Sequence, residues 1–508
     1  MVGTTLAALP ALVTPSSYDL LGLLPELILG GAFVLLMVLD VFLPAARRNW
    51  LAVFAFVALA AAFGATMWAW FDAGSGRELY YGSFAYDRFS MFVNAILLVS
   101  AALVVIISPQ YLNRRGIHHG EYYALILAAT TGMMILAGAM NLMVIFLGIE
   151  LLSISLYVLS GFSRGEERSQ EAAMKYLLLG GFASGFLLYG MALVYGETGH
   201  TQLVQIGLAL RAAQNVDPLV LVGVILVFIG FAFKTSSAPF HAWTPDVYQG
   251  APTSVTMFMS VATKVAAFAA LVRVFTYTFP QVYTHWQVIV SLVAILSMLV
   301  GNIAALTQTS LKRMLAYSGI AQAGYILIGV AVKPTEALGT ISVLYYLAAY
   351  AVTNIGAFAV ITVMAGRGED LDSYDGLRGL AHRRPYVAAA MALFLLSLGG
   401  FPPTAGFFAK FFVFSAAIKT GLTPLAIWGI VTSVLAVFYY LRVALLMYQR
   451  PAAGEREYPW SRTSISGGIV LGATTVGTLV LGILVFLVFT AAAAAQTGLL
   501  PALATSSG

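Results

Sequence analysis

Several ionisable side chains stand out because they lie within long apolar stretches of the sequence. They are Glu150, Lys175, Lys234, His241, Lys264 and Lys410. A charge near the centre of a bilayer costs at least about 2.5–3.5 kcal/mol on insertion scales, so residues of this kind usually serve a function. Burial disfavours the charged form of an amine or a carboxylate, which lets either group exchange protons near neutral pH. These residue types predict movement of protons or other cations across a membrane.

Lys264 and Glu150 are the most central of these residues. Lys264 lies about twelve residues from either end of its apolar stretch, so its four-carbon side chain cannot reach an interface. Glu150 is similarly central and requires a nearby cation or a bound proton. We expect both to function in transport, with a purely structural ion pair as the alternative for Glu150.

Lys234 and Lys410 each lie next to a proline that interrupts an apolar stretch. Lys234 precedes Pro239, and Lys410 follows Pro402 and Pro403. Proline removes a backbone donor and frees carbonyls, and such carbonyls are tolerated at membrane depth only inside protein or beside water. Two interrupted spans at corresponding places indicate two inverted repeats with an ion site between them. The alternative is that each lysine only caps the end of a half-helix.

Lys175 and His241 are weaker candidates. Lys175 lies about one turn from the end of its apolar stretch and could either reach the interface or pair with Glu150. His241 lies beside the first proline, where an imidazole could relay protons or form a structural hydrogen bond. His118 and His119 are adjacent and would point in different directions, so we expect no metal site.

Composition identifies the elements that must position these residues. The chain has 508 residues, of which 60% are hydrophobic and 9% are charged, whereas soluble proteins carry roughly 25% charged residues. A water-soluble globular enzyme and a disordered chain are both excluded. There are no cysteines, which excludes disulfides and thiolate ligands for zinc or iron–sulfur clusters. We also find no glycine-rich phosphate loop or dinucleotide motif.

Apolar stretches of about 20 residues predict an all-α polytopic membrane protein with about fourteen transmembrane helices. The predicted spans are 20–42, 50–71, 87–107, 122–139, 141–162, 172–196, 218–248, 252–277, 285–306, 312–332, 338–365, 386–420, 424–448 and 465–490. We group them as three N-terminal helices in 1–110, a first repeat in 120–277, a second in 285–450, and a last helix with its tail in 463–508. Open sheet edges cannot lie in lipid, so strands are excluded from the spans.

The basic residues of the loops predict the orientation. Loops after odd-numbered spans carry Arg47, Arg48, Arg114, Arg115, Arg164, Arg168, Lys312, Arg313, Arg367, Arg378, Arg383, Arg384, Arg450, Arg456 and Arg462, and loops after even-numbered spans carry Arg77, Arg88, Arg211, Arg273, Lys333 and Lys419. The positive-inside rule then places the odd loops in the cytoplasm and both termini outside. The segment Met1–Asp19 has no basic residue before its apolar residues, so we expect no cleavable signal peptide.

Four stretches resemble one family over essentially the whole chain. LLPELIL, KTSSAPFHAWTPDVYQGAPT, TQTSLKRMLAYSGIAQAGY and LLSLGGFPPTAGFFAKF resemble the antiporter-like subunit N, also called subunit 2 or B, of respiratory complex I and its photosynthetic relatives. The resemblance implies fourteen helices, with broken helices seven and twelve in two inverted five-helix repeats.

The resemblance also implies roles for individual residues. Glu150 resembles the family's fifth-helix glutamate, and Lys234 resembles its partner lysine in the broken seventh helix. Lys264 resembles the lysine that links two half-channels, and Lys410 the lysine at the outward exit. Lys175 aligns with a sixth-helix lysine of less certain role. Gln322 occupies a position where many bacterial members have histidine. Because glutamine does not titrate, a water-mediated proton path is the alternative there.

These observations predict a proton-translocating membrane subunit of a complex I-type NADH:quinone oxidoreductase. The resemblance implies no cofactor on this chain, with NADH, FMN, iron–sulfur clusters and quinone bound by other subunits. It also implies further antiporter-like subunits, a peripheral redox arm and lipids as partners, and no nucleic acid. We expect a bacterial inner membrane, with a thylakoid-type membrane as the alternative, because the cyanobacterial and plastid branch resembles the glutamine form. NADH and ferredoxin both stay open as electron donors.

Two other functions stay open. One is a subunit of a multi-subunit sodium/proton antiporter or of a membrane-bound hydrogenase, which would share the fold. The other is a scaffold that only tethers other subunits. The charges at mid-membrane depth argue against a scaffold, because a scaffold has no reason to carry their insertion cost.

Overall fold

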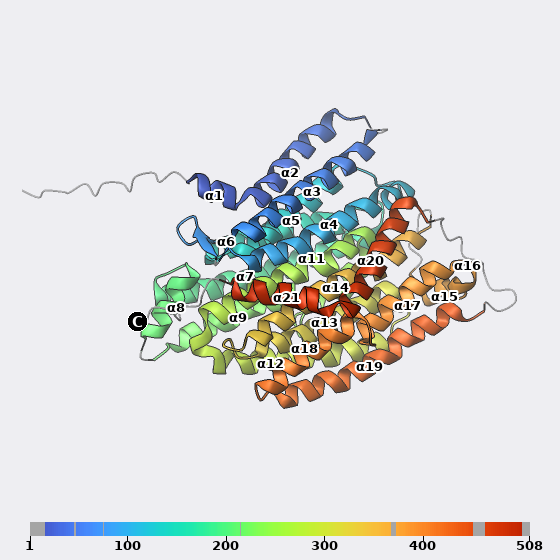
Figure 1. Ribbon diagram of the computed structural model, residues 1–508. Helices are drawn as coiled ribbons and strands as arrows, with labels where there is room; N and C mark the ends of the chain where they lie inside the picture. Colours follow the sequence, from blue (N-terminus) through green and yellow to red (C-terminus); the bar gives the residue numbers. More distant parts are fainter. Residues whose placement is uncertain are drawn as a thin grey trace, which may run out of the picture.

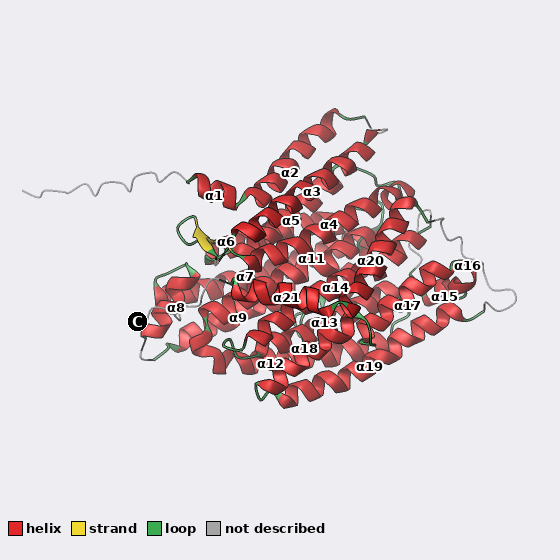
Figure 2. Cartoon of the chain, in the orientation of Figure 1, coloured by secondary structure: helices red, strands yellow, loops and turns green. Residues whose placement is uncertain are grey.

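The structure is a computed structural model that describes residues 16–44, 47–74, 76–213, 215–366, 372–450 and 463–499. Arg367, Arg456 and Arg462, which entered the charge comparison, lie outside the described residues, as do most of the N-terminal segment and the C-terminal tail. The described part of the chain is almost entirely helical (Figures 1 and 2). The predicted all-α class is therefore confirmed.

Among the α-helices of the described ranges, which also include several short ones, twelve segments are long and apolar enough to cross a membrane. The helices are α1 Ser17–Gly22, α2 Leu24–Phe42, α3 Asn49–Asp72, α4 Arg88–Arg115, α5 Glu121–Gly138, α6 Leu142–Ser160, α7 Glu167–Thr198, α8 Leu203–Ala212, α9 Pro218–Lys234, α10 Trp243–Gly250, α11 Thr253–Val272, α12 Tyr283–Leu306, α13 Leu311–Ala331, α14 Ala337–Met364, α15 Tyr374–Leu377, α16 Leu380–Arg383, α17 Pro385–Gly399, α18 Ala405–Lys419, α19 Thr423–Tyr448, α20 Ile465–Ile483 and α21 Val485–Thr497. A π-helical turn, Arg273–Thr278, continues α11, and a 3-10 turn, Pro280–Val282, precedes α12.

The two longest predicted spans, 218–248 and 386–420, are each divided into two shorter helices. Helix α9 ends at Lys234 and α10 begins at Trp243, while α17 ends at Gly399 and α18 begins at Ala405. The predicted interruptions near the prolines are thus confirmed. Both interruptions leave helix-end carbonyls that need donors from elsewhere in the protein.

Helix α11 forms the centre of the bundle, and every residue from Thr253 to Val272 is buried. It packs against α4, α5, α6, α9 and α14. Helices α2 and α3 extend from the edge of the bundle (Figure 1) and expose much of their apolar surface. Close helix contacts rely on glycine: a Cβ atom at Gly132 of α5 would lie 2.8 Å from the backbone nitrogen of Leu152 in α6. Small residues allow such approach between membrane helices.

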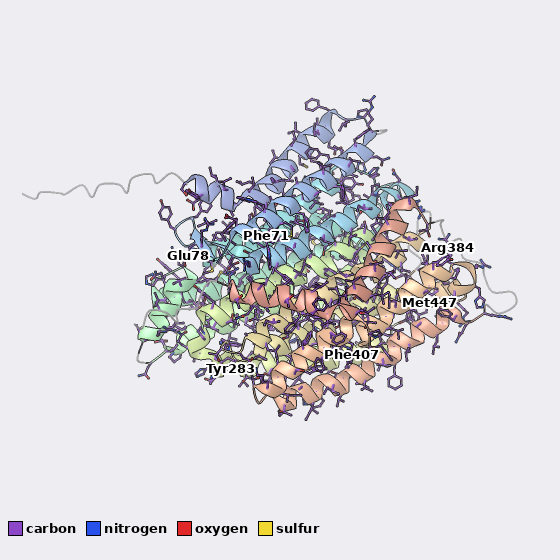
Figure 3. All side chains as sticks on the ribbon, in the orientation of Figure 1. Phe71, Glu78, Tyr283, Arg384, Phe407 and Met447 are labelled. Atoms are coloured by element: carbon purple, nitrogen blue, oxygen red, sulfur yellow. The ribbon has the colours of Figure 1, made fainter. Side chains whose placement is uncertain are left out.

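The two ends of the bundle carry different loops. Glu78 and Tyr283, from loops after even-numbered spans, lie at one end, and Arg384, from a loop after an odd-numbered span, lies at the other (Figure 3). The sequence did not predict two elements at the first end, helix α8 and a short antiparallel hairpin of β1 Arg77–Leu79 and β2 Phe84–Tyr86 (Figure 2). The hairpin follows α3 and precedes α4, so its edges lie outside the predicted spans.

The C-terminal span, predicted as one helix over 465–490, is divided at Leu484. Helix α21 crosses the front of the bundle in Figure 1 and packs against α4 and α14. Tertiary contacts fix the end of α20. Tyr345 donates a hydrogen bond to the Leu481 carbonyl over 2.5 Å, and a Cβ at Gly482 would lie 2.1 Å from the Pro403 carbonyl oxygen. The apolar sequence alone carries no sign of this change of direction.

Two basic residues that we assigned to loops are in fact buried. Arg273 is fully buried and donates two hydrogen bonds to Asp87, over 2.8 and 3.0 Å, and another to the Ala137 carbonyl. Lys312 is also buried and donates to the Ala251 carbonyl over 2.8 Å. Both assignments were wrong because a paired or hydrogen-bonded cation can be buried at a helix end. Removing these two leaves the excess of basic residues after odd-numbered spans intact.

Candidate functional site

Lys234 is the last residue of α9, at the first helix interruption, and its side chain points into the bundle with 3% exposure. Its Nζ donates a hydrogen bond to Ser153 Oγ of α6 over 2.6 Å. The rings of Tyr157 and Tyr176 each lie 5.4 Å from Nζ, where aromatic faces stabilise a cation. The site can therefore hold the lysine in its charged form while leaving it able to release a proton.

Glu150 lies one turn before Ser153 on α6 and is half-buried. Ser184 Oγ of α7 donates to Glu150 Oε1 over 2.5 Å. Glu150 is close enough to Lys234 for their charges to interact, but among the described residues neither side chain forms an ion pair within 4 Å. A serine hydroxyl therefore binds each of these two side chains, and a small movement would change the distance between the Glu150 carboxylate and the Lys234 amine.

Lys264 lies in the middle of α11 and is fully buried. Its Nζ donates to Ser236 Oγ over 3.1 Å and to Tyr248 Oη over 3.2 Å. Both partners come from the interrupted helix, one from the break and one from α10. Within the described ranges Lys264 has no acidic partner, so two hydroxyl groups and the ring of Tyr248, 5.5 Å from Nζ, compensate its burial.

Lys410 lies in the second turn of α18, directly after the second interruption, with 5% exposure. Its Nζ donates to the Gly399 carbonyl over 3.0 Å and to Ser433 Oγ over 2.7 Å, and it lies 4.8 Å from the centre of the Tyr325 ring. Lys410 also lines a cavity of about 300 Å³ between α17, α18 and α19. Lys410 therefore lies beside an opening in the surface of the described part of the chain.

Polar side chains of α13, α14 and α19 occupy the space between Lys264 and Lys410. A Cβ at Gly319 would lie 3.2 Å from Tyr350 Oη and 3.7 Å from Lys264 Nζ, so both side chains lie against this glycine. Beyond it, Gln322 donates to the Leu398 carbonyl over 3.1 Å and to Tyr440 over 3.3 Å, and accepts from Tyr346. Polar groups therefore lie near both lysines: Tyr350 near Lys264, and Gln322 at the carbonyl next to the one that Lys410 binds.

The weaker candidates lie away from the buried lysines. Lys175 forms ion pairs with Glu171, over 2.6 Å, and with Asp246 of α10, over 2.7 Å, rather than with Glu150. Arg313 also pairs with Asp246 over 2.7 Å. His241 lies in the first interruption, half-buried, and its Nδ1 has no hydrogen-bond partner among the described residues. The structure gives Lys234, Lys264 and Lys410 hydroxyl or carbonyl partners and brings Glu150 near Lys234. We call these four side chains and their partners the polar region, to which Lys175 and His241 do not belong.

Sequence reasoning missed the neutral partners of the lysines. Ser153, Ser184, Ser236, Tyr248 and Ser433 lie in apolar helices or at a helix break, where hydroxyl residues are common. One signal was available: Ser153 follows Glu150 by three residues, which places both on one helix face. The described residues hold no group of three or more acidic or histidine residues that could bind a metal ion.

Comparison with known proteins identifies the family. The family described as NADH:quinone oxidoreductase/Mrp antiporter, TM, matches residues 139–436. NADH-quinone oxidoreductase subunit N of Trichlorobacter lovleyi is 44% identical over 463 residues, which cover 91% of this chain and 94% of that protein. The chain belongs to the subunit N family. The matched region begins before α6 and ends within α19, so it contains all four residues of the polar region.

Two solved structures share the fold of this family. Respiratory complex I from Thermus thermophilus with bound aureothin contains a chain that is 34% identical, with a TM-score of 0.78 over 92% of this chain and 99% of that chain. A chain of the Mrp complex from a Dietzia species is 23% identical, with a TM-score of 0.81 over 95% of this chain and 97% of that chain. The second likeness concerns the fold alone.

Proposed function

We propose that this chain is a proton-translocating membrane subunit of an NADH:quinone oxidoreductase of the complex I type. The observation that supports this most strongly is the polar region itself. Three buried lysines, Lys234, Lys264 and Lys410, are each held by hydroxyl or carbonyl groups inside a bundle that belongs to the subunit N family. Such neutral partners let a lysine gain and lose a proton without breaking an ion pair.

We assign the residues the following roles. Glu150 modulates Lys234 through its charge, Lys264 transfers protons between two half-channels, and Lys410 releases them through the adjacent cavity. Two inverted five-helix repeats, in 120–277 and 285–450, position the two helix interruptions. A conformational signal that moves Glu150 relative to Lys234 would change the proton affinity of that lysine, and this change would couple the chain to its neighbours.

The redox chemistry belongs to other subunits in this proposal. NADH, FMN, iron–sulfur clusters and quinone would bind there, and this chain would contact further antiporter-like subunits, lipids and, indirectly, the peripheral redox arm. We place the chain in a bacterial inner membrane, with both termini outside, following the distribution of its basic residues.

A second candidate function is that of a sodium/proton antiporter subunit, because a chain of the Mrp complex shares the fold. Purification from native membrane in mild detergent discriminates the two. Flavin and iron–sulfur absorbance, with their proteins identified by mass spectrometry, would support the redox-driven pump. Recovery of small membrane proteins alone, together with sodium-dependent proton exchange in vesicles, would support the antiporter and overturn the first proposal.

A further inference from the structure

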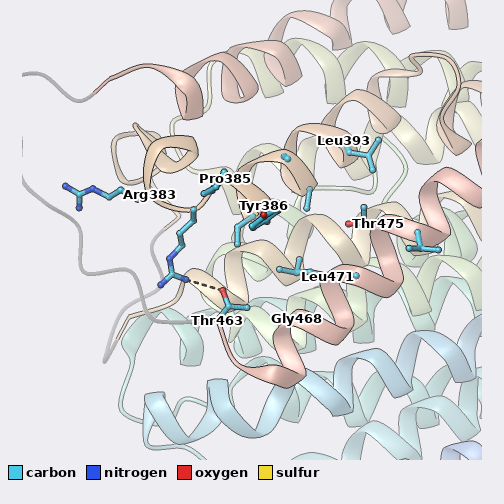
Figure 4. A pocket seen from close by; sticks show the side chains of 14 residues that line it. Arg383, Pro385, Tyr386, Leu393, Thr463, Gly468, Leu471 and Thr475 are labelled. Carbon is cyan, nitrogen blue, oxygen red and sulfur yellow. Dashed lines mark hydrogen bonds between the residues drawn. The ribbon is translucent and has the colours of Figure 1, made fainter.

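A groove lies between α17 and α20, and none of the buried lysines of the polar region is among the residues that line it. It has a volume of about 1030 Å³ and is lined mainly by apolar side chains, among them Val387, Leu393, Leu471 and Val476. Ligand sites in proteins usually have about 300–1,000 Å³, so this groove is at the upper end of that range. Figure 4 draws the side chains that line the groove and labels Leu393 of α17 and Leu471 of α20 among them.

Positive charge gathers at one end of the groove. Arg383 and Arg384 are the lining residues at this end, where Arg384 Nη1 donates to Thr463 Oγ1 over 3.2 Å and the Arg383 side chain extends outward from the groove (Figure 4). Arg114 at the end of α4 is near enough to Arg384 for the two charges to repel each other. Helices α17 and α20 also both begin at this end, and helix N-termini attract anions. The mouth therefore complements a negatively charged group.

The depth of the groove indicates what kind of molecule fills it. From Ser464, the N-cap of α20, to Val476 is 12 residues, or about 18 Å of helix at 1.5 Å per residue. Half of a bilayer's hydrocarbon core is about 15 Å. A groove with a cationic mouth and the depth of one leaflet matches a lipid, whereas a partner's transmembrane helix would require a groove across the whole membrane.

Two glycines of α20 leave space in the groove for a bound molecule. Gly468 and Gly472 are four residues apart on α20, and a Cβ at either position would meet nothing within 4 Å. Both residues line the groove. Larger side chains at these positions would therefore fill the groove without displacing protein atoms.

We propose that this groove binds one anionic phospholipid, with its phosphate at Arg383 and Arg384 and one acyl chain between α17 and α20. The site is separate from the polar region of the lysines, and it would anchor the start of α17, the first half of the second interrupted helix. This proposal does not depend on the proposed function.

Photo-crosslinking of the intact complex tests the site. The complex is reconstituted in phosphatidylcholine vesicles that contain phosphatidylglycerol with a photoactivatable acyl chain, and labelled peptides are mapped by mass spectrometry. We expect labelling of α17 and α20 in the wild type. The double variant Gly468→Leu/Gly472→Leu should lose this labelling at least about tenfold, a free-energy change of about 1.4 kcal/mol.

A matched control exists on α7. Gly181 and Gly185 are also four residues apart, and a Cβ at either one meets nothing within 4 Å. The variant Gly181→Leu/Gly185→Leu should keep the α17 and α20 labelling at the wild-type level. Labelling that the groove-filling variant does not reduce would overturn the proposal.

The arginines test the choice of headgroup independently of packing. Each basic residue near a membrane surface contributes about 1 kcal/mol toward anionic lipid. Arg383→Gln/Arg384→Gln should therefore reduce the preference for phosphatidylglycerol over an equally labelled phosphatidylcholine roughly thirtyfold. An unchanged preference would overturn the phosphate assignment. A crosslink between the groove and a neighbouring subunit would show that protein occupies it, and would overturn the lipid proposal.

Discussion

The two helix interruptions place their lysines in different surroundings. Lys234 ends the half-helix before the first break, and its closest partner is a serine of α6, with Glu150 one turn away on the same helix. Lys410 lies in the second turn of the half-helix after the second break, where it donates to the Gly399 carbonyl and lines a cavity. Among the described residues no carboxylate lies within ion-pair distance of Lys410.

The backbone of the two breaks is also satisfied in different ways. In the first break, the indole of Trp243 donates to the Phe233 carbonyl over 3.1 Å. This helix-end carbonyl therefore does not need a hydrogen bond from Lys234. In the second, Gln322 donates to the Leu398 carbonyl and Lys410 to the Gly399 carbonyl. The first lysine thus lies near an acid, and the second is bound to the helix end itself. In the proposed function, this difference would make the first break a regulated entry and the second a structurally fixed exit.

The largest effect should follow removal of the residue between the two breaks. Lys264→Ala removes the fully buried amine that contacts both the break and α10, and we expect proton translocation to fall about 100-fold, as for other positioned acid–base groups. Proton uptake and quinone reduction are measured together in vesicles. Lys419→Ala is the matched control, because Lys419 is exposed and pairs with Glu336. An unchanged ratio of protons to electrons in Lys264→Ala would contradict the proposed path.

Double-mutant cycles test whether only the first lysine is coupled to an acid. Glu150→Gln combined with Lys234→Ala should deviate from additivity by about 0.5–3 kcal/mol in activation free energy, as neighbouring residues do. Glu150→Gln combined with Lys410→Ala should be additive within about 0.5 kcal/mol, because these sites are separate. The cycles use pumping rates of the assembled complex. Equal coupling in the two cycles would remove the distinction between the breaks.

Substitutions of the capping side chains compare the backbone of the two breaks. Gln322→Leu removes the side-chain donor of the Leu398 carbonyl, at a cost of about 1–3 kcal/mol. Trp243→Phe removes the side-chain donor of the Phe233 carbonyl, which keeps its bond from the Ser236 N–H. Gln322→Leu should be the more destabilising, because Gln322 has two further partners, Tyr440 and Tyr346. Thermal unfolding of the complex measures both. Gln322→His, which keeps a donor, is the control, and a larger effect of Trp243→Phe would contradict this ranking.

The smallest effect concerns a region that contacts neither break. The Tyr80 N–H donates to Asp19 over 3.0 Å, and this bond, with those from Ser16, holds the pKa of Asp19 below 3.8. The stabilisation is therefore present above about pH 4 and is lost as the pH falls through the lowered pKa of the folded state. Hydrogen exchange of α1 should therefore increase in the wild type as the pH falls through this pKa. The Asp19→Asn variant should show increased exchange at every pH, and its pumping should be unchanged. Altered pumping in Asp19→Asn would mean that the N-terminal helices influence the breaks.

Several features of the fold could be predicted from the sequence for physical reasons. Long apolar stretches can only be helices in a membrane, and prolines at 239, 402 and 403 mark the places where two of them are interrupted. Lys264 could be placed at mid-depth by counting residues. The division of the last helix at Leu484 could not be predicted, because contacts of Leu481 and Gly482 with distant residues decide it.

The sequence by itself determined the class of protein, the positions of the interruptions and the central position of Lys264 and Glu150 in their spans, because insertion cost depends mainly on residue type and depth. Only the tertiary structure decided the partners. Buried and lipid-facing helices are both largely apolar here, so the sequence pattern does not show which face of a helix meets which neighbour. For that reason the pairing of Lys175 with Asp246, the burial of Arg273 on Asp87 and the hydroxyl partners of the lysines emerged only from the packing.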